Sequence, residues 1–146
     1  MTARGRFSAA LIALALSQPV EAEEDLRSAT SEKFSVGQVW KYKVREGESG
    51  ARVHVGKIEA IRDHVIIRVK LTGLEIKVAG SVGSVVGHAP IAEDALARSV
   101  TEVSSEPADL EGFADGYSGW REAFDAGNAG WFTHSLAEVV AMIEQG

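Results

Sequence analysis

Apolar and polar residues alternate along residues 37–78, and this pattern predicts an antiparallel β-meander. In the first strand, Trp40, Tyr42 and Val44 are separated by basic residues, a period of two that is typical of a strand with one buried face. Residues 46–50 are polar and contain two glycines, so they have the composition and length of a hairpin turn. The chain is therefore expected to fold back here into a second strand.

The second strand contains a change of face. Val53 and Val55 continue one alternation, whereas the isoleucines that follow fall on the opposite phase, and Gly56 lies at the change. A glycine at a position where the buried face switches predicts a β-bulge.

A third strand is predicted at residues 65–71. Its apolar residues share one face, and Arg68 and Lys70 lie on the opposite face, which we expect to be polar. Residues 74–78 alternate again, and they form either a fourth strand or a bent continuation of the third.

After residue 91 the apolar period lengthens to that of a helix, and three helices are predicted. The first spans residues 92–104, with acidic residues in its first turn, where the helix dipole favours them. No capping side chain stands at its start, so we expect a weak cap. The second spans residues 110–126. Ser135 and Glu138 form a capping-box pattern at the start of the third.

The second predicted helix carries two parallel ridges. The aromatic ridge consists of Phe113, Tyr117, Trp120 and Phe124. The small-residue ridge consists of Gly112, Gly116, Gly119 and Ala123. Each glycine within a helix destabilises it by roughly 1 kcal/mol relative to alanine. We therefore expect this ridge to lie against a neighbouring backbone, so that Gly119→Leu would overpack the contact. The alternative is a solvent-facing ridge, in which case Gly119→Ala should stabilise the protein by up to about 1 kcal/mol.

Strands followed by helices predict an α+β fold. In this fold an N-terminal antiparallel meander of four to five strands is covered on one face by three C-terminal helices. The same order argues against a doubly wound parallel sheet. Residues 34–146 have the length of a single domain, and a domain of this size buries about two-thirds of its unfolded surface.

Residues 1–22 have the pattern of a secretory signal peptide. Arg4 and Arg6 precede a short apolar run, and Ala22 is the small residue that cleavage requires. The run is shorter than the roughly 20 residues that span a bilayer, so we expect no stable membrane span. The alternative is an N-terminal helix of the mature chain. Residues 23–33 are predicted to form a flexible lead-in or a short helix.

The charge balance limits the classes of partner. The chain has 15 Lys and Arg residues and 21 Asp and Glu residues, and loss of Arg4, Arg6 and Glu21 with the leader gives a formal net charge of −7. This acidity argues against nucleic acid and against anionic membrane surfaces. The chain has no cysteine, so its stability must come from a packed core even in an oxidising compartment.

Three stretches of the chain carry a resemblance to known sequences. They are Gly-Gln-Val-Trp-Lys-Tyr at residues 37–42, Trp-Arg-Glu-Ala-Phe-Asp-Ala-Gly at residues 120–127 after Gly116-Tyr117, and Phe132-Thr133 after Ala129-Gly130. In these stretches the chain resembles a family of small uncharacterised bacterial proteins. The resemblance covers residues 34–145 and implies the same fold. That family has no established activity, so the resemblance implies no functional residue.

Few residues are candidates for chemistry. His88 and His134 are the two histidines considered for a shared site, but neither lies in a His-Glu-x-x-His pattern, and a hydrogen-bonded loop imidazole is the simpler interpretation.

Residues 79–90 are rich in glycine, and they predict a loop around a short strand or a mobile lid. They lack the Lys-Ser/Thr of a phosphate loop, and Ser84 lacks a Gly-x-Ser-x-Gly elbow. Trp131 is either an aromatic contact for a partner or a core residue, and core packing is favoured.

These patterns favour an exported binding or interaction module, periplasmic or extracellular, with an inhibitor, immunity-like or accessory role. We expect no catalytic group, metal or cofactor, a protein or small-molecule partner, and a monomer or weak oligomer. The candidate binding residues are His88, Ser84, His134 and Trp131. Because loops on a rigid scaffold usually carry binding, residues 79–90 should border the recognition surface, with His88 at its rim. The alternatives are a small metal-dependent hydrolase using His88 and His134, and a structural envelope component.

Overall fold

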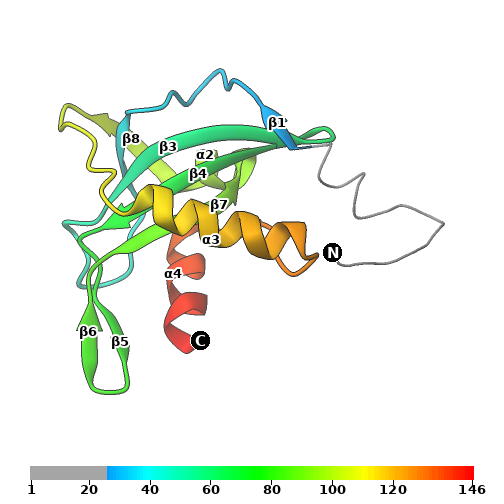
Figure 1. Ribbon diagram of the computed structural model, residues 1–146. Helices are drawn as coiled ribbons and strands as arrows, with labels where there is room; N and C mark the ends of the chain where they lie inside the picture. Colours follow the sequence, from blue (N-terminus) through cyan, green and yellow to red (C-terminus); the bar gives the residue numbers. More distant parts are fainter. Residues whose placement is uncertain (1–25) are drawn as a thin grey trace.

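The computed structural model describes residues 26–146, and its longest strands form a central β-hairpin (Figure 1). β3 (Arg52–Ile61) and β4 (His64–Thr72) pair antiparallel, and in the turn between them Arg62 has a left-handed backbone with φ of 56°. The register of the pair shifts between Val55 and Lys57. The β-bulge predicted at Gly56 is therefore confirmed.

The hairpin is the middle of a six-stranded sheet in the order β7-β4-β3-β2-β8, in which β1 also pairs with β3. The flanking strands are β1 (Leu26–Ser28), β2 (Val39–Tyr42), β7 (Val86–Ala92) and β8 (Val100–Ser104). All their pairings are antiparallel, which confirms the predicted α+β class, with more strands than the four to five expected. β1 lies within the predicted lead-in. Its Leu26 side chain packs against an apolar cluster that contains Ile61, which explains why this polar stretch joins the sheet.

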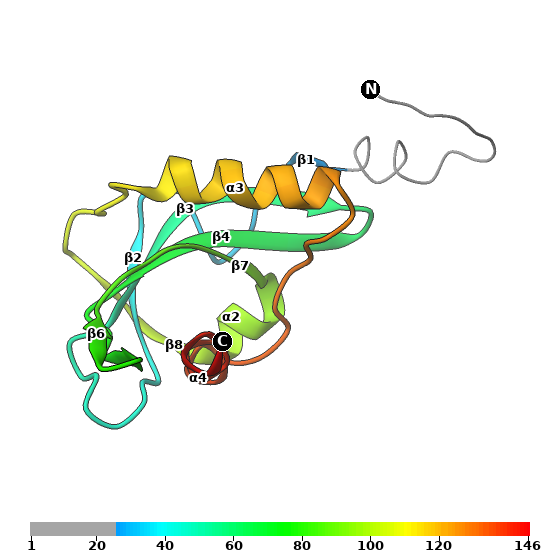
Figure 2. The ribbon, with the colours of Figure 1, turned by 60° about the horizontal axis from the view of Figure 1, so that its bottom comes forward.

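Helices lie on both faces of the sheet (Figure 2). α3 (Phe113–Asp125) covers one face, whereas α2 (Glu93–Ser99) and α4 (Leu136–Gln145) cover the other. Neighbouring residues of a strand point to opposite faces. On β4, Ile67 belongs to the core beneath α2 and α4, and Ile66 packs against α3. The structure differs here from the expectation of one covered face, because α3 covers the face of β4 that carries Ile66, Arg68 and Lys70. Within residues 26–146, no helix combines the length and apolar character needed to cross a membrane.

The first predicted helix is shorter than expected. α2 ends at Ser99 and the chain continues directly as β8, so residues 100–104 form an edge strand instead of continuing the helix. Val100, Thr101 and Val103 are β-branched and favour a strand, and pairing with β2 satisfies their backbone groups. The weak cap is confirmed, since Ala92 holds the N-cap position and no side chain caps the helix.

The last helix begins as predicted. The Ser135 hydroxyl accepts a hydrogen bond from the backbone N–H of Glu138, and the Glu138 carboxylate accepts one from the backbone N–H of Ser135. This capping box directs an apolar face onto the sheet. Leu136, Val139 and Val140 on that face are fully buried in the larger core.

A short hairpin projects from the body of the molecule (Figure 1). β5 (Ile76–Val78) and β6 (Ser81–Gly83) are joined by Ala79 and Gly80, whose φ angles of 51° and 83° are both left-handed, as a type I′ turn requires. Much of the glycine-rich segment predicted as a loop or lid is therefore an ordered hairpin arm that leads into β7.

Candidate functional site

α3 lies close to the sheet because two glycines leave room for side chains. A Cβ atom added at Gly56 would lie 2.5 Å from Cζ of Phe113, and one added at Gly116 would lie 2.8 Å from Cβ of His88. Both distances are well inside van der Waals contact, so a larger residue would push the helix away. The bulge of β3 thus receives the first aromatic ring of α3, and the helix backbone passes directly over β7.

A buried ion pair lies beneath the aromatic ridge of α3. Arg68 is 0% exposed, and its Nε donates a hydrogen bond to Glu59 Oε1 at 2.6 Å. The guanidinium carbon lies 3.7 Å from the centroid of the Trp120 ring, and the Tyr117 hydroxyl donates to Glu59 Oε2 at 2.9 Å. Burial lowers the pKa of Arg68, and Glu59 opposes that shift. Since an arginine remains protonated in proteins, the ridge is packed on a balanced pair of charges.

His88 lies between this ion pair and the aromatic ridge. Its ring centroid lies 5.6 Å from that of Phe113, 5.7 Å from that of Tyr117 and 6.1 Å from that of Trp120. Its Nε2 is 3.3 Å from Nη1 of Arg68. Burial, followed by the positive charge of Arg68, lowers the pKa of His88 to about 4. At neutral pH the ring is therefore uncharged, and Nε2 accepts a hydrogen bond from the guanidinium.

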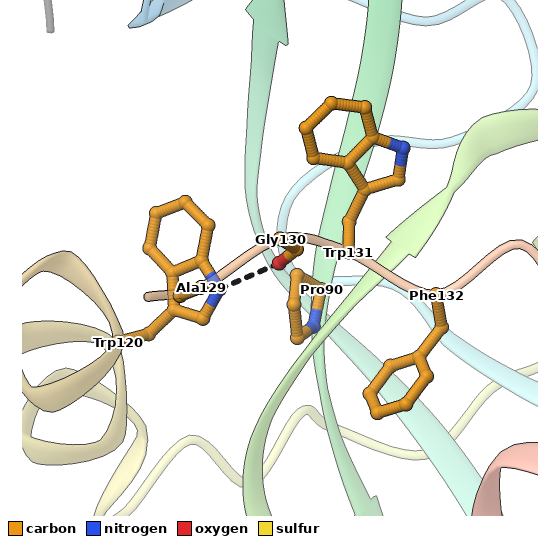
Figure 3. A pocket seen from close by; sticks show the side chains of 6 residues that line it. All are labelled: Pro90, Trp120, Ala129, Gly130, Trp131 and Phe132. Carbon is orange, nitrogen blue, oxygen red and sulfur yellow. Dashed lines mark hydrogen bonds between the residues drawn. The ribbon is translucent and has the colours of Figure 1, made fainter. Parts of the chain in front are cut away.

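An apolar hollow opens beside α3, where residues 129–132 run along β7 (Figure 3). Its volume is about 340 Å³, and its lining residues are Pro90, Trp120, Ala129, Gly130, Trp131 and Phe132. The Trp120 indole N–H donates to the carbonyl of Gly130 at 2.8 Å, and the backbone N–H of Phe132 donates to the carbonyl of Pro90 at 2.9 Å. These bonds hold the walls in place. No lining side chain is charged, so the hollow suits an apolar or aromatic group.

Of the four predicted site residues, the structure places one in the lining of this hollow and three elsewhere. Trp131 lines it, and His88 contacts Trp120 from the side of the sheet. Ser84 is exposed at the base of the hairpin arm, where its carbonyl accepts a hydrogen bond from Leu74. His134 is exposed just before α4. Within the described residues His88 contacts side chains of α3 and Arg68, whereas His134 is exposed, and no hydrogen bond or ring contact joins the two imidazoles.

Within the part of the chain that the structure describes, no group of three or more His, Asp or Glu side chains is arranged to hold a metal ion. The polar groups that do converge are Glu59, Arg68, Tyr117 and His88. They face the underside of α3, so they position the aromatic ridge.

Sequence reasoning missed the importance of Glu59 and Arg68. Arg68 and Lys70 were expected on a polar outer face, yet they are 0% and 4% exposed, because α3 and the segment before it cover that face. His54 is likewise buried, and it bonds the Thr72 hydroxyl at 2.9 Å. The one signal in the strand itself is Ile66, an apolar residue on the same face as Arg68 and Lys70.

No protein-family model, curated protein or solved structure matches this chain. The resemblance to small bacterial proteins therefore stays a prediction, and the function has to be argued from the hollow itself.

Proposed function

We propose that this protein is an exported interaction module that binds an apolar or aromatic group of a partner protein in the hollow beside α3. One observation carries the proposal. Trp120 and Trp131 flank Pro90 at an uncharged hollow on the surface (Figure 3). Tryptophan is enriched among the few interface residues that supply most of the binding energy, and such residues cluster around apolar pockets.

The size of the hollow favours binding of one or two side chains of a partner protein over binding of a complete small-molecule ligand. A volume of about 340 Å³ lies at the lower end of the range of roughly 300–1,000 Å³ that ligand pockets occupy. Its lining residues come from α3, β7 and the segment that connects α3 to α4. A hollow of this kind accepts one or two side chains that project from a neighbouring surface.

The hollow is preorganised, which reduces the entropy lost on binding. Trp120 is fixed by its hydrogen bond to Gly130 and by its contact with the Arg68 guanidinium. Phe132 forms a parallel bridge with Ile91, so the connecting segment is tied to the edge of the sheet. A partner would therefore meet walls that are already in position.

The proposed surface includes only the end of residues 79–90, the segment predicted to border the recognition surface. Pro90 ends that segment and lines the hollow, and His88 lies behind Trp120. Ser84 and His134 lie outside the proposed surface.

Site-specific photo-crosslinking in the native envelope tests the proposal. Ala129 lines the hollow, so a benzoylphenylalanine at this position should form a discrete adduct with a partner. The same probe at Ala114, an exposed residue on α3, is the matched control. We expect the adduct from position 129 only, and we expect Trp131→Ala to remove it. Equal adducts from both positions, or an adduct that survives Trp131→Ala, would contradict the proposal.

Export is the second part of the proposal. It is supported by the basic, apolar and small-residue succession of residues 1–22, which lies outside the residues that the structure describes. N-terminal sequencing of the exported protein should begin at Glu23. An intact chain that starts at Met1 and is found only in the cytoplasm would exclude this localisation.

A further inference from the structure

We infer that residues 105–112, the segment between β8 and α3, form a strap over the sheet that opens in acid, because closing it requires an uncharged His54. The inference goes beyond the proposed function and is independent of the hollow. Two features of the structure carry it. The strap is tied to buried side chains of the sheet, and one of these ties is incompatible with a protonated imidazole.

The strap is held from beneath by two neighbouring side chains. His54 on β3 and Lys70 on β4 are directly opposite each other in the strand register, and each is 4% exposed. Lys70 Nζ donates to Asp109 Oδ1 at 3.0 Å and to the carbonyl of Glu111 at 2.8 Å. The backbone N–H of Asp109 donates to Nδ1 of His54 at 3.0 Å. Asp109 is therefore bound through its side chain by one residue and through its backbone by the other.

The hydrogen bonds of His54 determine its protonation state. A backbone N–H can only donate, so Nδ1 accepts from Asp109 and carries no proton. The proton of the neutral ring is then on Nε2, which donates to the Thr72 hydroxyl at 2.9 Å. Protonation would put a second N–H on the ring, pointing at the N–H of Asp109. The charged ring therefore cannot keep the strap in this position.

The charges around His54 do not restore the protonated form. Burial is the main cause that lowers the pKa of His54 below its ordinary value near 6.5. Asp109 and Glu106, both in the strap, oppose that shift, whereas Lys70 on β4 and Arg52 on β3 reinforce it. The hydrogen bond from Lys70 also lowers the pKa of Asp109, so the carboxylate stays charged and engaged while His54 titrates.

Opening of the strap is therefore linked to proton uptake. In the open strap the ring reaches water and regains a pKa near 6.5, so the open form binds a proton where the closed form does not. Opening should become more favourable as pH falls below about 6.5, by up to about tenfold for each pH unit. The bond from Lys70 to the carbonyl of Glu111 does not involve His54, so the opening is local to the chain around Asp109.

Hydrogen exchange of the Asp109 amide, followed by NMR, tests the inference, because this N–H is the donor to His54. Protection factors between about pH 7.5 and about pH 5 remove the intrinsic effect of pH on exchange. We expect the protection of Asp109 to fall by up to about tenfold per pH unit below about 6.5. Val69, a fully buried residue of β4, is the internal control and should be more protected at every pH.

Two variants assign the effect to one histidine. His54→Asn keeps an acceptor near the position of Nδ1 and cannot titrate, so the pH dependence of Asp109 protection should disappear. His88→Phe removes the histidine beneath α3 and should leave that dependence unchanged. The nitrogen signals of the wild-type His54 ring give a second readout that needs no variant, and they should show the proton on Nε2 at neutral pH.

Several results would overturn the inference. They are a wild-type proton on Nδ1 of His54, wild-type protection of Asp109 that does not change with pH, and a wild-type slope in His54→Asn. Equal protection of Asp109 and Val69 at every pH would show that the strap opens only when the whole molecule unfolds. A slope that disappears in His88→Phe would assign the opening to α3 instead of the strap.

Discussion

Arg68 connects the sheet to α3. Its guanidinium has three kinds of neighbour: the Glu59 carboxylate, the Trp120 ring and the His88 imidazole. Its Nη2 atom is buried and has no hydrogen-bond partner within the described chain. A buried guanidinium with an unpaired N–H is retained at a cost in stability. The hydrogen bond to Glu59 joins β4 to β3, and the contact with the Trp120 ring depends on α3, so docking of this helix adds to what offsets the cost.

His88 should make the stability of the protein depend on pH. Its pKa of about 4 in the folded state is below the ordinary value near 6.5, so the unfolded chain binds a proton in a range where the folded chain does not. Stability is then fully present above about pH 6.5 and is lost as pH falls towards 4. Because the ring is only partly buried, we expect a loss of about 1–3 kcal/mol.

Urea unfolding between pH 7 and pH 4.5 measures this loss. His88→Phe keeps a ring among the aromatic side chains but cannot titrate, so its stability should fall less over this range. His134→Gln changes an exposed histidine and should behave as the wild type. If His88→Phe shows the same slope as the wild type, His88 does not carry the pH dependence.

At the scale of the element, the glycines of α3 have different roles. Gly116 faces His88 at a distance that excludes a Cβ atom, whereas a Cβ atom at Gly119 would have nothing within 4 Å. The close approach expected for the small-residue ridge is therefore present at Gly116. It is absent at the exposed Gly119, where the solvent-facing alternative applies. Gly112 has a φ of 81° and precedes the helix as its N-cap.

The two positions give opposite predictions for the same substitution. Gly116→Ala should destabilise the protein by about 1–3 kcal/mol, because the added methyl group overpacks the contact with β7. Gly119→Ala should stabilise it by up to about 1 kcal/mol, because alanine restricts the unfolded chain and has open space in the folded one. Urea melts of the two variants against the wild type decide. Effects of the same sign would show that α3 does not approach β7 as described.

Sequence patterns predicted correctly those features that depend only on residues close together in the chain. The bulge at Gly56 and the capping box at Ser135 depend on a few neighbouring residues, and both are confirmed. The change from α2 to β8 was missed because residues 92–104 fit a helical spacing throughout. Only pairing with β2, some 60 residues earlier, makes residues 100–104 a strand.

The hollow illustrates the same limit. Trp131 and Pro90 were in segments singled out beforehand, but the packing of Trp120 onto Arg68 depends on which face of the sheet α3 covers. The sequence contains both Trp120 and Arg68, but no pattern of neighbouring residues indicates that the two side chains are in contact.

At the scale of the whole molecule, the sheet is a middle layer with helices on both sides, so charges on its α3 face are enclosed. This arrangement predicts strong coupling between Glu59 and Arg68. Arg68→Met should destabilise by about 3–5 kcal/mol, because the Glu59 carboxylate is left buried without its cation. The double variant Glu59→Gln with Arg68→Met should lie much closer to the wild type. Neither member of this buried pair is charged in the double variant, and the amide oxygen that replaces the carboxylate can still accept a hydrogen bond from Tyr117.

Urea unfolding of the wild type, the two single variants and the double variant completes the thermodynamic cycle. We expect a coupling energy of about 3 kcal/mol, because the double variant should recover most of the loss caused by Arg68→Met. If the single-variant effects simply add in the double variant, the ion pair has no energetic role in holding α3 to the sheet.

Arg68 also affects the chain before it has folded. Without Arg68 and Lys70, residues 65–71 would be an unbroken run of β-branched and aliphatic residues, the composition that promotes pairing between unfolded chains. In the folded protein β4 is shielded by β3 and β7, but β7 follows it only after the projecting hairpin arm. Until that arm has formed, one edge of β4 is open to other molecules. A positive charge in the middle of the strand is a gatekeeper during this interval, and it disfavours aggregation of the newly made chain.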